Sequence, residues 1–340
     1  MPKSFYAEGL FLPSAIILGL TLSFIITPFV CRAARRAGIV DIPRDGRRMH
    51  ERAVPLAGGA GMIAAFLISL AFFGAWGGGG LRPFPLAVFC FLCGVYGLID
   101  DKFALPVYAK LAFQLFVGVG ASLVLARAEA FCAFDRTVPL GSFSVPATAL
   151  WIVFMMNAVN LIDGIDGLCS GACATLAACT SILLFARGYS AEAAFAAALS
   201  GACLGFLFHN RAPAKIFMGE TGSAFLGFAL AVLALPLFSA EEPSPLAAVL
   251  PAFLLPAVEA VGSFLRRAQK GKNPFAPDKE HMHHVLYARF ASVPKVCAAM
   301  YAFSLICAFA SLEYARHRAL SFLLLAAAIV FMRLLLAKRR

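Results

Sequence analysis

Residues 10–36 read LFLPSAIILGLTLSFIITPFVCRAARR, an apolar run that ends in a cluster of arginines. A helix needs about 20 predominantly apolar residues to cross a bilayer, and this run is long enough. No small-residue cleavage site follows it, so we expect an anchor that stays on the protein rather than a cleaved signal peptide. Similar runs recur as far as Leu336, and the sequence therefore predicts an all-α, polytopic bundle of transmembrane helices.

The composition also indicates a membrane protein. Of the 340 residues, 61% are hydrophobic and only 14% are charged, and the mean hydropathy is +0.84. A soluble domain has about a quarter of its residues charged. We expect one membrane-embedded domain, residues 1–340, with about eleven spans. They are predicted at approximately 10–31, 54–74, 84–99, 109–126, 146–161, 170–187, 191–209, 222–238, 245–265, 295–312 and 319–337.

The basic residues predict how these spans are oriented. If the loop after the first span is cytoplasmic, 22 of the 29 lysines and arginines fall on the inner side, as the positive-inside rule requires. The N-terminus is then outside and the C-terminus is cytoplasmic, so the number of spans must be odd. The same distribution accounts for the net charge of +11 without nucleic acid as a partner.

Carboxylates gather on the inner side as well, where 11 of the 18 acidic residues fall. A carboxylate that faces lipid is costly, so those near span ends should face a protein cleft or water. We expect five inner loops to form a cytoplasmic active site that handles metal and phosphate: residues 32–53, 100–109, 160–170, 210–222 and 266–295.

The third span ends in GLIDDKFALP, residues 97–106. Two adjacent carboxylates, Asp100 and Asp101, repel each other at a membrane surface. We therefore expect either a raised pKa for one of them or a cation nearby.

The fifth span ends in NAVNLIDGIDGLCSG, residues 157–171. Asn157, Asn160 and Asp163 recur every three residues, which places them on one helix face. Gly164 and Gly167 should then end the helix, so that Asp163 and Asp166 lie on a loop beside exposed backbone amides. Oxygen ligands of this kind suit Mg²⁺, which binds few protein groups together with substrate phosphates.

Three further segments indicate phosphate or metal binding. Residues 217–228, FMGETGSAFLGF, predict a tight turn into a helix, with Glu220 placed to hold a metal against a diphosphate. Residues 41–59, DIPRDGRRMHERAVPLAGG, contain Asp41 among several arginines. His281, His283 and His284 follow Arg266 in the largest inner loop. They have no cysteine nearby, and adjacent histidines do not easily share one tetrahedral zinc, so we expect them to bind phosphate.

These five blocks, in this order, resemble the polyprenyl-phosphate N-acetylhexosamine-1-phosphate transferases of glycosyltransferase family 4 over nearly the whole chain. The resemblance implies a multi-pass enzyme of the bacterial inner (plasma) membrane. Such an enzyme transfers a hexosamine 1-phosphate from a UDP-sugar to undecaprenyl phosphate with Mg²⁺, or alternatively Mn²⁺. The His-x-His-His and Asp-Asp-x-x-x-Leu-Pro patterns look like the N-acetylglucosamine branch, which starts lipopolysaccharide O-antigen and teichoic acid synthesis. A homodimer is left open.

Carried over residue by residue, the resemblance implies three catalytic residues: Asp100 and Asp101 near the lipid phosphate, and Asp163. Asn160, Asp163 and Glu220 would hold the metal and the diphosphate. The remaining substrate contacts would come from Asp41, Asn157, Gly164, Asp166, Phe217, Arg266, His281, His283 and His284, with Gly164, Asp166 and Phe217 bordering the uridine.

The sequence departs from this family in two places and leaves two alternatives. The family usually has aspartate where this chain has Glu220, which is one methylene longer and puts the metal position or the rate in doubt, and Glu259 likewise stands where aspartate is expected. The branch that transfers phospho-N-acetylmuramoyl-pentapeptide is one alternative, although it usually has a lysine where this chain has Ala104. A membrane transporter is the other, but its carboxylates should lie near mid-bilayer. Direct attack by the lipid phosphate and a covalent aspartyl intermediate both remain open.

Overall fold

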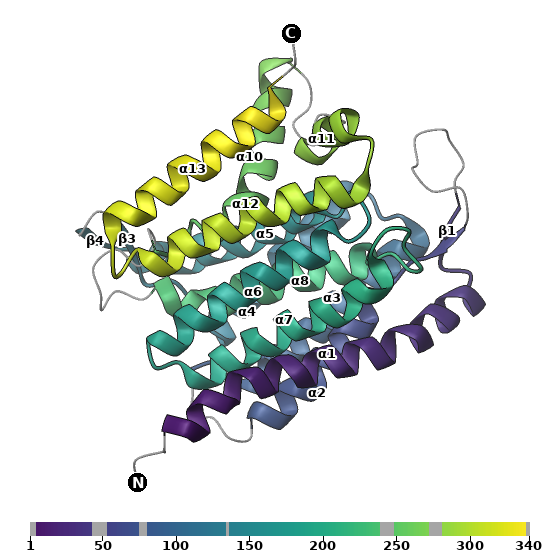
Figure 1. The fold of residues 1–340 in the computed structure, drawn as a ribbon. Coiled ribbons are helices and arrows are strands. Elements are labelled where there is room, and N and C mark those ends of the chain that lie inside the picture. The colour runs from purple at the N-terminus through teal and green to yellow at the C-terminus, as the bar shows by residue number, and fades with distance from the viewer. Residues whose placement is uncertain are drawn as a thin grey trace.

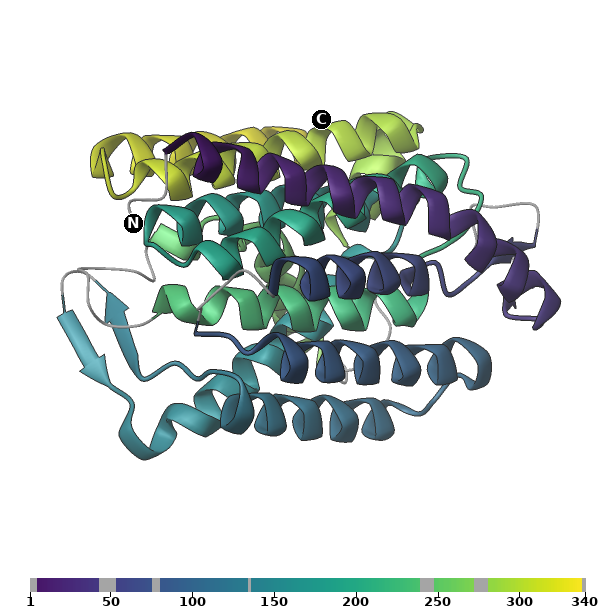
Figure 2. The ribbon, with the colours of Figure 1, turned by 90° about the horizontal axis from the view of Figure 1, so that it is seen from below.

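The computed structural model describes residues 5–42, 53–74, 80–133, 136–238, 248–271 and 281–337. The chain forms a bundle of helices that run roughly side by side (Figures 1 and 2). Within the described ranges, nine helices are long and apolar enough to cross a membrane. The predicted all-α, polytopic architecture is therefore confirmed.

The helices are α1 (Phe5–Arg36), α2 (Gly59–Gly74), α3 (Pro83–Phe103), α4 (Val107–Val124), α5 (Ser144–Ile162), α6 (Leu168–Ala186), α7 (Ser190–Asn210), α8 (Gly219–Ala234), α10 (Leu254–Gln269), α11 (Met282–Phe290), α12 (Val293–Glu313) and α13 (Arg318–Leu336). Short 3-10 helices, η1 (Gly141–Phe143) and η2 (Leu235–Phe238), extend α5 and α8. The strands form two antiparallel hairpins, β1 (Val40–Asp41) with β2 (Val54–Pro55) and β3 (Ala130–Ala133) with β4 (Arg136–Pro139).

Nine of the eleven predicted spans correspond to these long apolar helices, and the other two correspond to α2 and α10, of 16 residues each. The span expected from residue 54 begins later, because Val54–Pro55 forms a strand and Ala57 has a positive φ of 69°. The number of spans and the orientation of the termini remain predictions.

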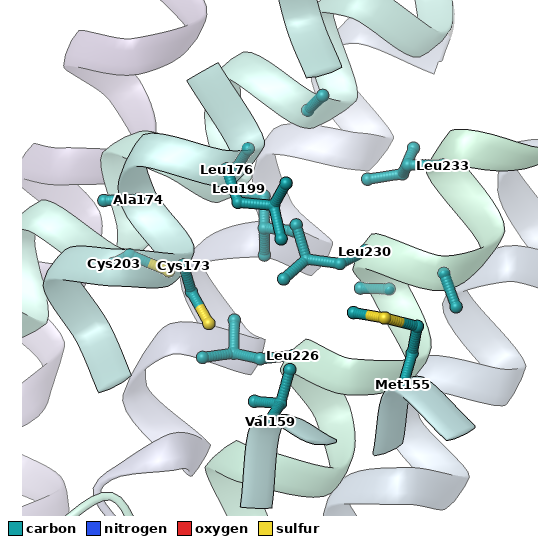
Figure 3. Packing of buried hydrophobic residues seen from close by; sticks show 14 of the residues in the cluster. Met155, Val159, Cys173, Ala174, Leu176, Leu199, Cys203, Leu226, Leu230 and Leu233 are labelled. Carbon is teal, nitrogen blue, oxygen red and sulfur yellow. The ribbon is translucent and has the colours of Figure 1, made fainter. Parts of the chain in front are cut away.

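Helix α8 lies at the centre of the bundle. In its most apolar window 94% of the residues are buried, against 17% for α13 at the periphery. Figure 3 shows side chains of α5, α6, α7 and α8 meeting in this centre, among them Met155, Cys173, Leu199 and Leu230. Lipid tails are as apolar as leucine, so contacts of this kind stabilise the fold through close packing more than through transfer from water.

The two hairpins mark opposite ends of the bundle (Figures 1 and 2). We call the end that carries β1 and β2 the site end. Helix α1 finishes there with Arg35 and Arg36 in its last turn, and α2 starts there after β2. Where the structure describes them, the segments that the sequence analysis singled out belong to helix ends and loops on this side.

Candidate active site

The last turn of α3 meets the first turn of α4 at a partly buried ion pair. Asp100 accepts a hydrogen bond from the backbone N–H of Leu105 at 2.8 Å and lies 2.5 Å from Nζ of Lys110. The same ammonium group is 3.5 Å from Oε2 of Glu220. Lys110 is therefore the cation that the adjacent carboxylates required, and the sequence analysis did not identify it as a site residue.

Asp101 points from α3 to the start of α8. Its Oδ1 accepts the backbone N–H of Glu220 at 2.7 Å, and its Oδ2 accepts the backbone N–H and the hydroxyl of Thr221 at 3.2 and 2.6 Å. Gly219 enters the helix with a positive φ of 71°, and a Cβ there would lie 2.4 Å from the carboxylate of Asp101. The tight turn predicted for this segment is confirmed.

The two asparagines near the end of α5 contact different helices. The amide nitrogen of Asn160 donates to Oε2 of Glu220 at 2.6 Å and to the hydroxyl of Ser223 at 3.1 Å, both on α8. Asn157 instead donates to Gln114 of α4 at 2.7 Å. The two amides, predicted to share one helix face, therefore contact different helices: Asn157 lies against α4 and Asn160 against α8.

A short loop connects α5 to α6, as the glycines predicted. Helix α5 ends at Ile162, and Gly167 has a φ of 81°. Asp166 accepts the backbone N–H of Ala214 at 2.9 Å, and Asn210 accepts that of Gly167 at 3.1 Å. Tyr301 of α12 donates to the carbonyl of Gly167 at 2.5 Å. These contacts fix the loop against the α7–α8 connection and α12.

Asp163 lies just beyond the end of α5, half-buried and surrounded by like charges. Its partial burial and the nearby carboxylates of Asp101, Glu220 and Asp166 raise its pKa to about 7. Such a group is stabilised in its charged form by a nearby cation.

The histidine segment lies against the α5–α6 loop. A Cβ at Gly164 would lie only 2.2 Å from Nε2 of His283, so glycine permits this contact. His281 and His283 stack with ring centroids 5.4 Å apart, and their Nδ1 atoms lie 3.2 and 3.6 Å from the two oxygens of the buried Glu259. The ring of His284 is 4.4 Å from that of His283.

The β1–β2 hairpin packs on the start of α8. The carbonyl of Pro55 accepts the N–H of Phe217 at 2.9 Å, and the carbonyl of Phe217 accepts that of Gly58 at 2.9 Å. Asp41 lies opposite Val54 in this hairpin. Arg266 is in the last turn of α10. Residues 43–52 and 272–280, which complete the first and last of the predicted loops, lie outside the described residues.

Two carboxylates and an amide could hold a magnesium ion here. Across the described ranges, no three His, Cys, Asp or Glu side chains form a metal-binding group on their own. Mg²⁺ commonly binds one or two carboxylates and takes its remaining ligands from substrate phosphates and water. Asp163 and Glu220, with Asn160 hydrogen-bonded to the latter, suit that chemistry, and a cation would offset the crowding of negative charge that raises the pKa of Asp163.

The sequence of this chain is similar to one family model and to several proteins of known name. Residues 84–237 match the model of glycosyl transferase family 4. The chain is 33% identical to a probable undecaprenyl-phosphate N-acetylglucosaminyl 1-phosphate transferase of Bacillus subtilis, over 81% of this chain and 76% of the relative. It is 34% identical to an undecaprenyl-phosphate alpha-N-acetylglucosaminyl 1-phosphate transferase of Thermotoga maritima, over 84% and 85%. A phospho-N-acetylmuramoyl-pentapeptide-transferase of Halalkalibacterium halodurans is 31% identical, over 81% and 90%.

Proposed function

The chain belongs to glycosyl transferase family 4, and we propose that it transfers N-acetylglucosamine 1-phosphate from UDP-N-acetylglucosamine to undecaprenyl phosphate, releasing UMP. Two relatives named for this reaction match more than four fifths of the chain. The product would start a cell-envelope polysaccharide. We place the reaction at the cytoplasmic face of a bacterial inner membrane, where UDP-sugars are available and where the basic loops are predicted to lie.

One observation carries the proposal: a lysine, two carboxylates and an amide from four helices converge at one end of a membrane bundle. Lys110 of α4 bridges Asp100 of α3 and Glu220 of α8, and Asn160 of α5 bonds the same glutamate. This arrangement suits a reaction between a lipid phosphate and a nucleotide diphosphate, because the lysine and a cation held by the carboxylates would offset the negative charge of both substrates. A transporter would place such groups near mid-bilayer.

In the proposed reaction an oxygen of the lipid phosphate attacks the β-phosphorus of the UDP-sugar. The bond from that phosphorus to the bridging oxygen breaks, and UMP leaves with the bridging oxygen. Lys110 attracts the lipid phosphate, and Asp100 holds Lys110 in place through their ion pair. Both oxygens of Asp100 already accept hydrogen bonds, which favours direct attack over an aspartyl intermediate.

The other half of the site would bind the donor. Mg²⁺, bound by Asp163, Asn160 and Glu220, would supply positive charge against the diphosphate. The α5–α6 loop and Phe217 would border the uridine. His283 and its neighbours, fixed against Gly164, would contact the phosphates or the sugar.

The test is lipid-dependent UMP release by the purified protein with Mg²⁺ and undecaprenyl phosphate. UDP-N-acetylglucosamine is compared with UDP-N-acetylmuramoyl-pentapeptide, because one relative is named for the second donor. Release from the first donor alone supports the proposal. Release from the second alone would assign the chain to the other branch, and release from neither would contradict both.

A further inference from the structure

Asp100 and Asp101 are adjacent in the sequence, but their side chains have different surroundings. Asp100 bonds the α3–α4 turn and Lys110. Asp101 receives three hydrogen bonds, and all of them come from Glu220 and Thr221 in the first turn of α8. The backbone N–H groups of a first turn have no partner within their own helix, and a side-chain acceptor usually satisfies them.

The acceptor here comes from another helix. The residue that precedes α8, Met218, gives no side-chain cap, so the carboxylate of α3 takes the place of a local capping residue. A carboxylate at a helix N-terminus is also favoured by the helix dipole.

Three glycines permit this close approach. A Cβ at Gly97, one turn before Asp101, would lie 2.3 Å from Cα of Thr221. A Cβ at Gly219 would collide with the Asp101 carboxylate itself, and one at Gly59 of α2 would lie 2.2 Å from Cα of Gly222. The backbones of α2, α3 and α8 therefore meet at the point where Asp101 bonds α8.

Glu220, whose own N–H is bonded by Asp101, is the carboxylate that pairs with Lys110 and Asn160. We propose that Asp101 is a positioning residue: it caps α8 from α3 and thereby fixes Glu220, and it does not react with the lipid phosphate. The role in catalysis rests on the proposed function, whereas the role as a cap does not.

The experiment compares Asp101→Asn with a pair of changes at its partner, Thr221→Val and Thr221→Ser. Thr221 is fully buried, and valine keeps its shape but removes the hydroxyl, whereas serine keeps the hydroxyl. The first readout is hydrogen exchange of the amides at residues 219–223 in purified, magnesium-free protein. Both oxygens of Asp101 accept hydrogen bonds, and asparagine offers only one acceptor oxygen. We therefore expect exchange about tenfold faster in Asp101→Asn and in Thr221→Val, the size of a lost helix cap, and near-normal exchange in Thr221→Ser.

The second readout is the dependence of UMP release on Mg²⁺. A displaced Glu220 should raise the Mg²⁺ concentration needed for half-maximal rate about tenfold in Asp101→Asn and Thr221→Val, as expected when a group that orients a metal ligand is lost, with much of kcat recovered at saturating Mg²⁺. The double variant should be little worse than Asp101→Asn, because both changes remove the same contact.

Two results would overturn the proposal. One is loss of turnover in Asp101→Asn at every Mg²⁺ concentration while Thr221→Val matches the wild type in both readouts, which would make Asp101 a reacting group. The other is unchanged amide exchange in Asp101→Asn. If the wild type releases UMP from neither donor, the proposed function fails, but the exchange measurement still decides whether Asp101 caps α8.

Discussion

Lys110 carries one positive charge between two carboxylates, Asp100 at 2.5 Å and Glu220 at 3.5 Å. Its side chain is 29% exposed, so the ammonium group can also face a substrate phosphate. Removal of the lysine would leave the two carboxylates facing each other without a cation, which is costly for partly buried groups.

Lys110→Gln should therefore reduce the rate of UMP release by about a hundredfold or more, comparable to the loss of one transition-state charge contact. Lys102→Gln is the matched control, because Lys102 is exposed and packs over the ring of Phe103, 5.5 Å from its centroid. Steady-state UMP release by the two variants provides the measurement. Equal activity of both variants and the wild type would remove Lys110 from the reaction.

Asp163 predicts a pH dependence of stability in the magnesium-free protein. Its pKa is about 7 in the folded protein, whereas an aspartate in an unfolded chain has a pKa near 3.9. The folded state thus keeps this proton to higher pH than the unfolded chain. The free energy of unfolding should fall as the pH rises from about 4 to about 7.

Thermal unfolding in detergent, measured between pH 4 and 8, tests this dependence. Asp163→Asn should show a smaller loss of Tm over this interval than the wild type, because it has no proton to lose. Glu129→Gln, at an exposed carboxylate, should retain the wild-type loss. Identical profiles for Asp163→Asn and the wild type would show that Asp163 is not destabilised in its charged form.

At the residue scale, local spacing predicted the α5–α6 loop and the turn before α8, because the responsible glycines and carboxylates are close in sequence. The partners Lys110, Gln114 and Thr221 were not predicted. Lys110 and Gln114 lie within an apolar stretch and Thr221 follows Glu220 in the first turn of α8, and each contacts a site residue of another helix. No periodicity within one segment indicates which helix packs beside it, although a lysine in the first turn of a span next to paired aspartates was a usable signal.

At the scale of elements, glycines determine how closely α3 and α8 approach. Gly94 and Gly97 are one turn apart on α3, but their surroundings differ. A Cβ at Gly97 would meet backbone atoms of Thr221 at 2.3 and 2.4 Å, whereas one at Gly94 would meet only the end of the Ile63 side chain at 2.7 Å. Backbone cannot move aside without moving the helix, but an isoleucine can change rotamer.

Gly97→Ala should therefore push α3 away from α8 and lower both Tm and UMP release, at a cost of about 1–3 kcal/mol for an overpacked contact. Gly94→Ala should leave both close to wild type. Both variants add one methyl group to α3, so a difference between them reports on the contact of α3 with the backbone of α8. A fully active Gly97→Ala variant would mean that the approach of α3 to α8 is not required for the site.

At the scale of the whole molecule, the path of the chain bears on the number of spans. Helix α2 begins at the site end, where Gly59 contacts Gly222, and finishes beside the start of α3, where Gly74 contacts Pro83. Helix α8 starts at the site end, and the chain is back there at His283, beside Gly164. The chain therefore passes from end to end in the regions of α2 and α10 as well, although each helix has only 16 residues.

This path predicts that the turn at Gly188 and the C-terminus lie on opposite sides of the membrane. Five helices lie between these two points along the chain: α7, α8, α10, α12 and α13. If α10 crosses the membrane like the other four, the number of crossings is odd. The test uses two reporters, each fused in turn at each of the two points. Alkaline phosphatase is active only outside the cytoplasm, and green fluorescent protein is fluorescent only inside it. We expect phosphatase activity at Gly188 and fluorescence after residue 340, because the basic residues favour a cytoplasmic C-terminus. If both reporters indicate the same side of the membrane, α10 does not cross it. If the fusion at Gly188 is fluorescent and the fusion after residue 340 has phosphatase activity, the site end lies outside, where a UDP-sugar is not available.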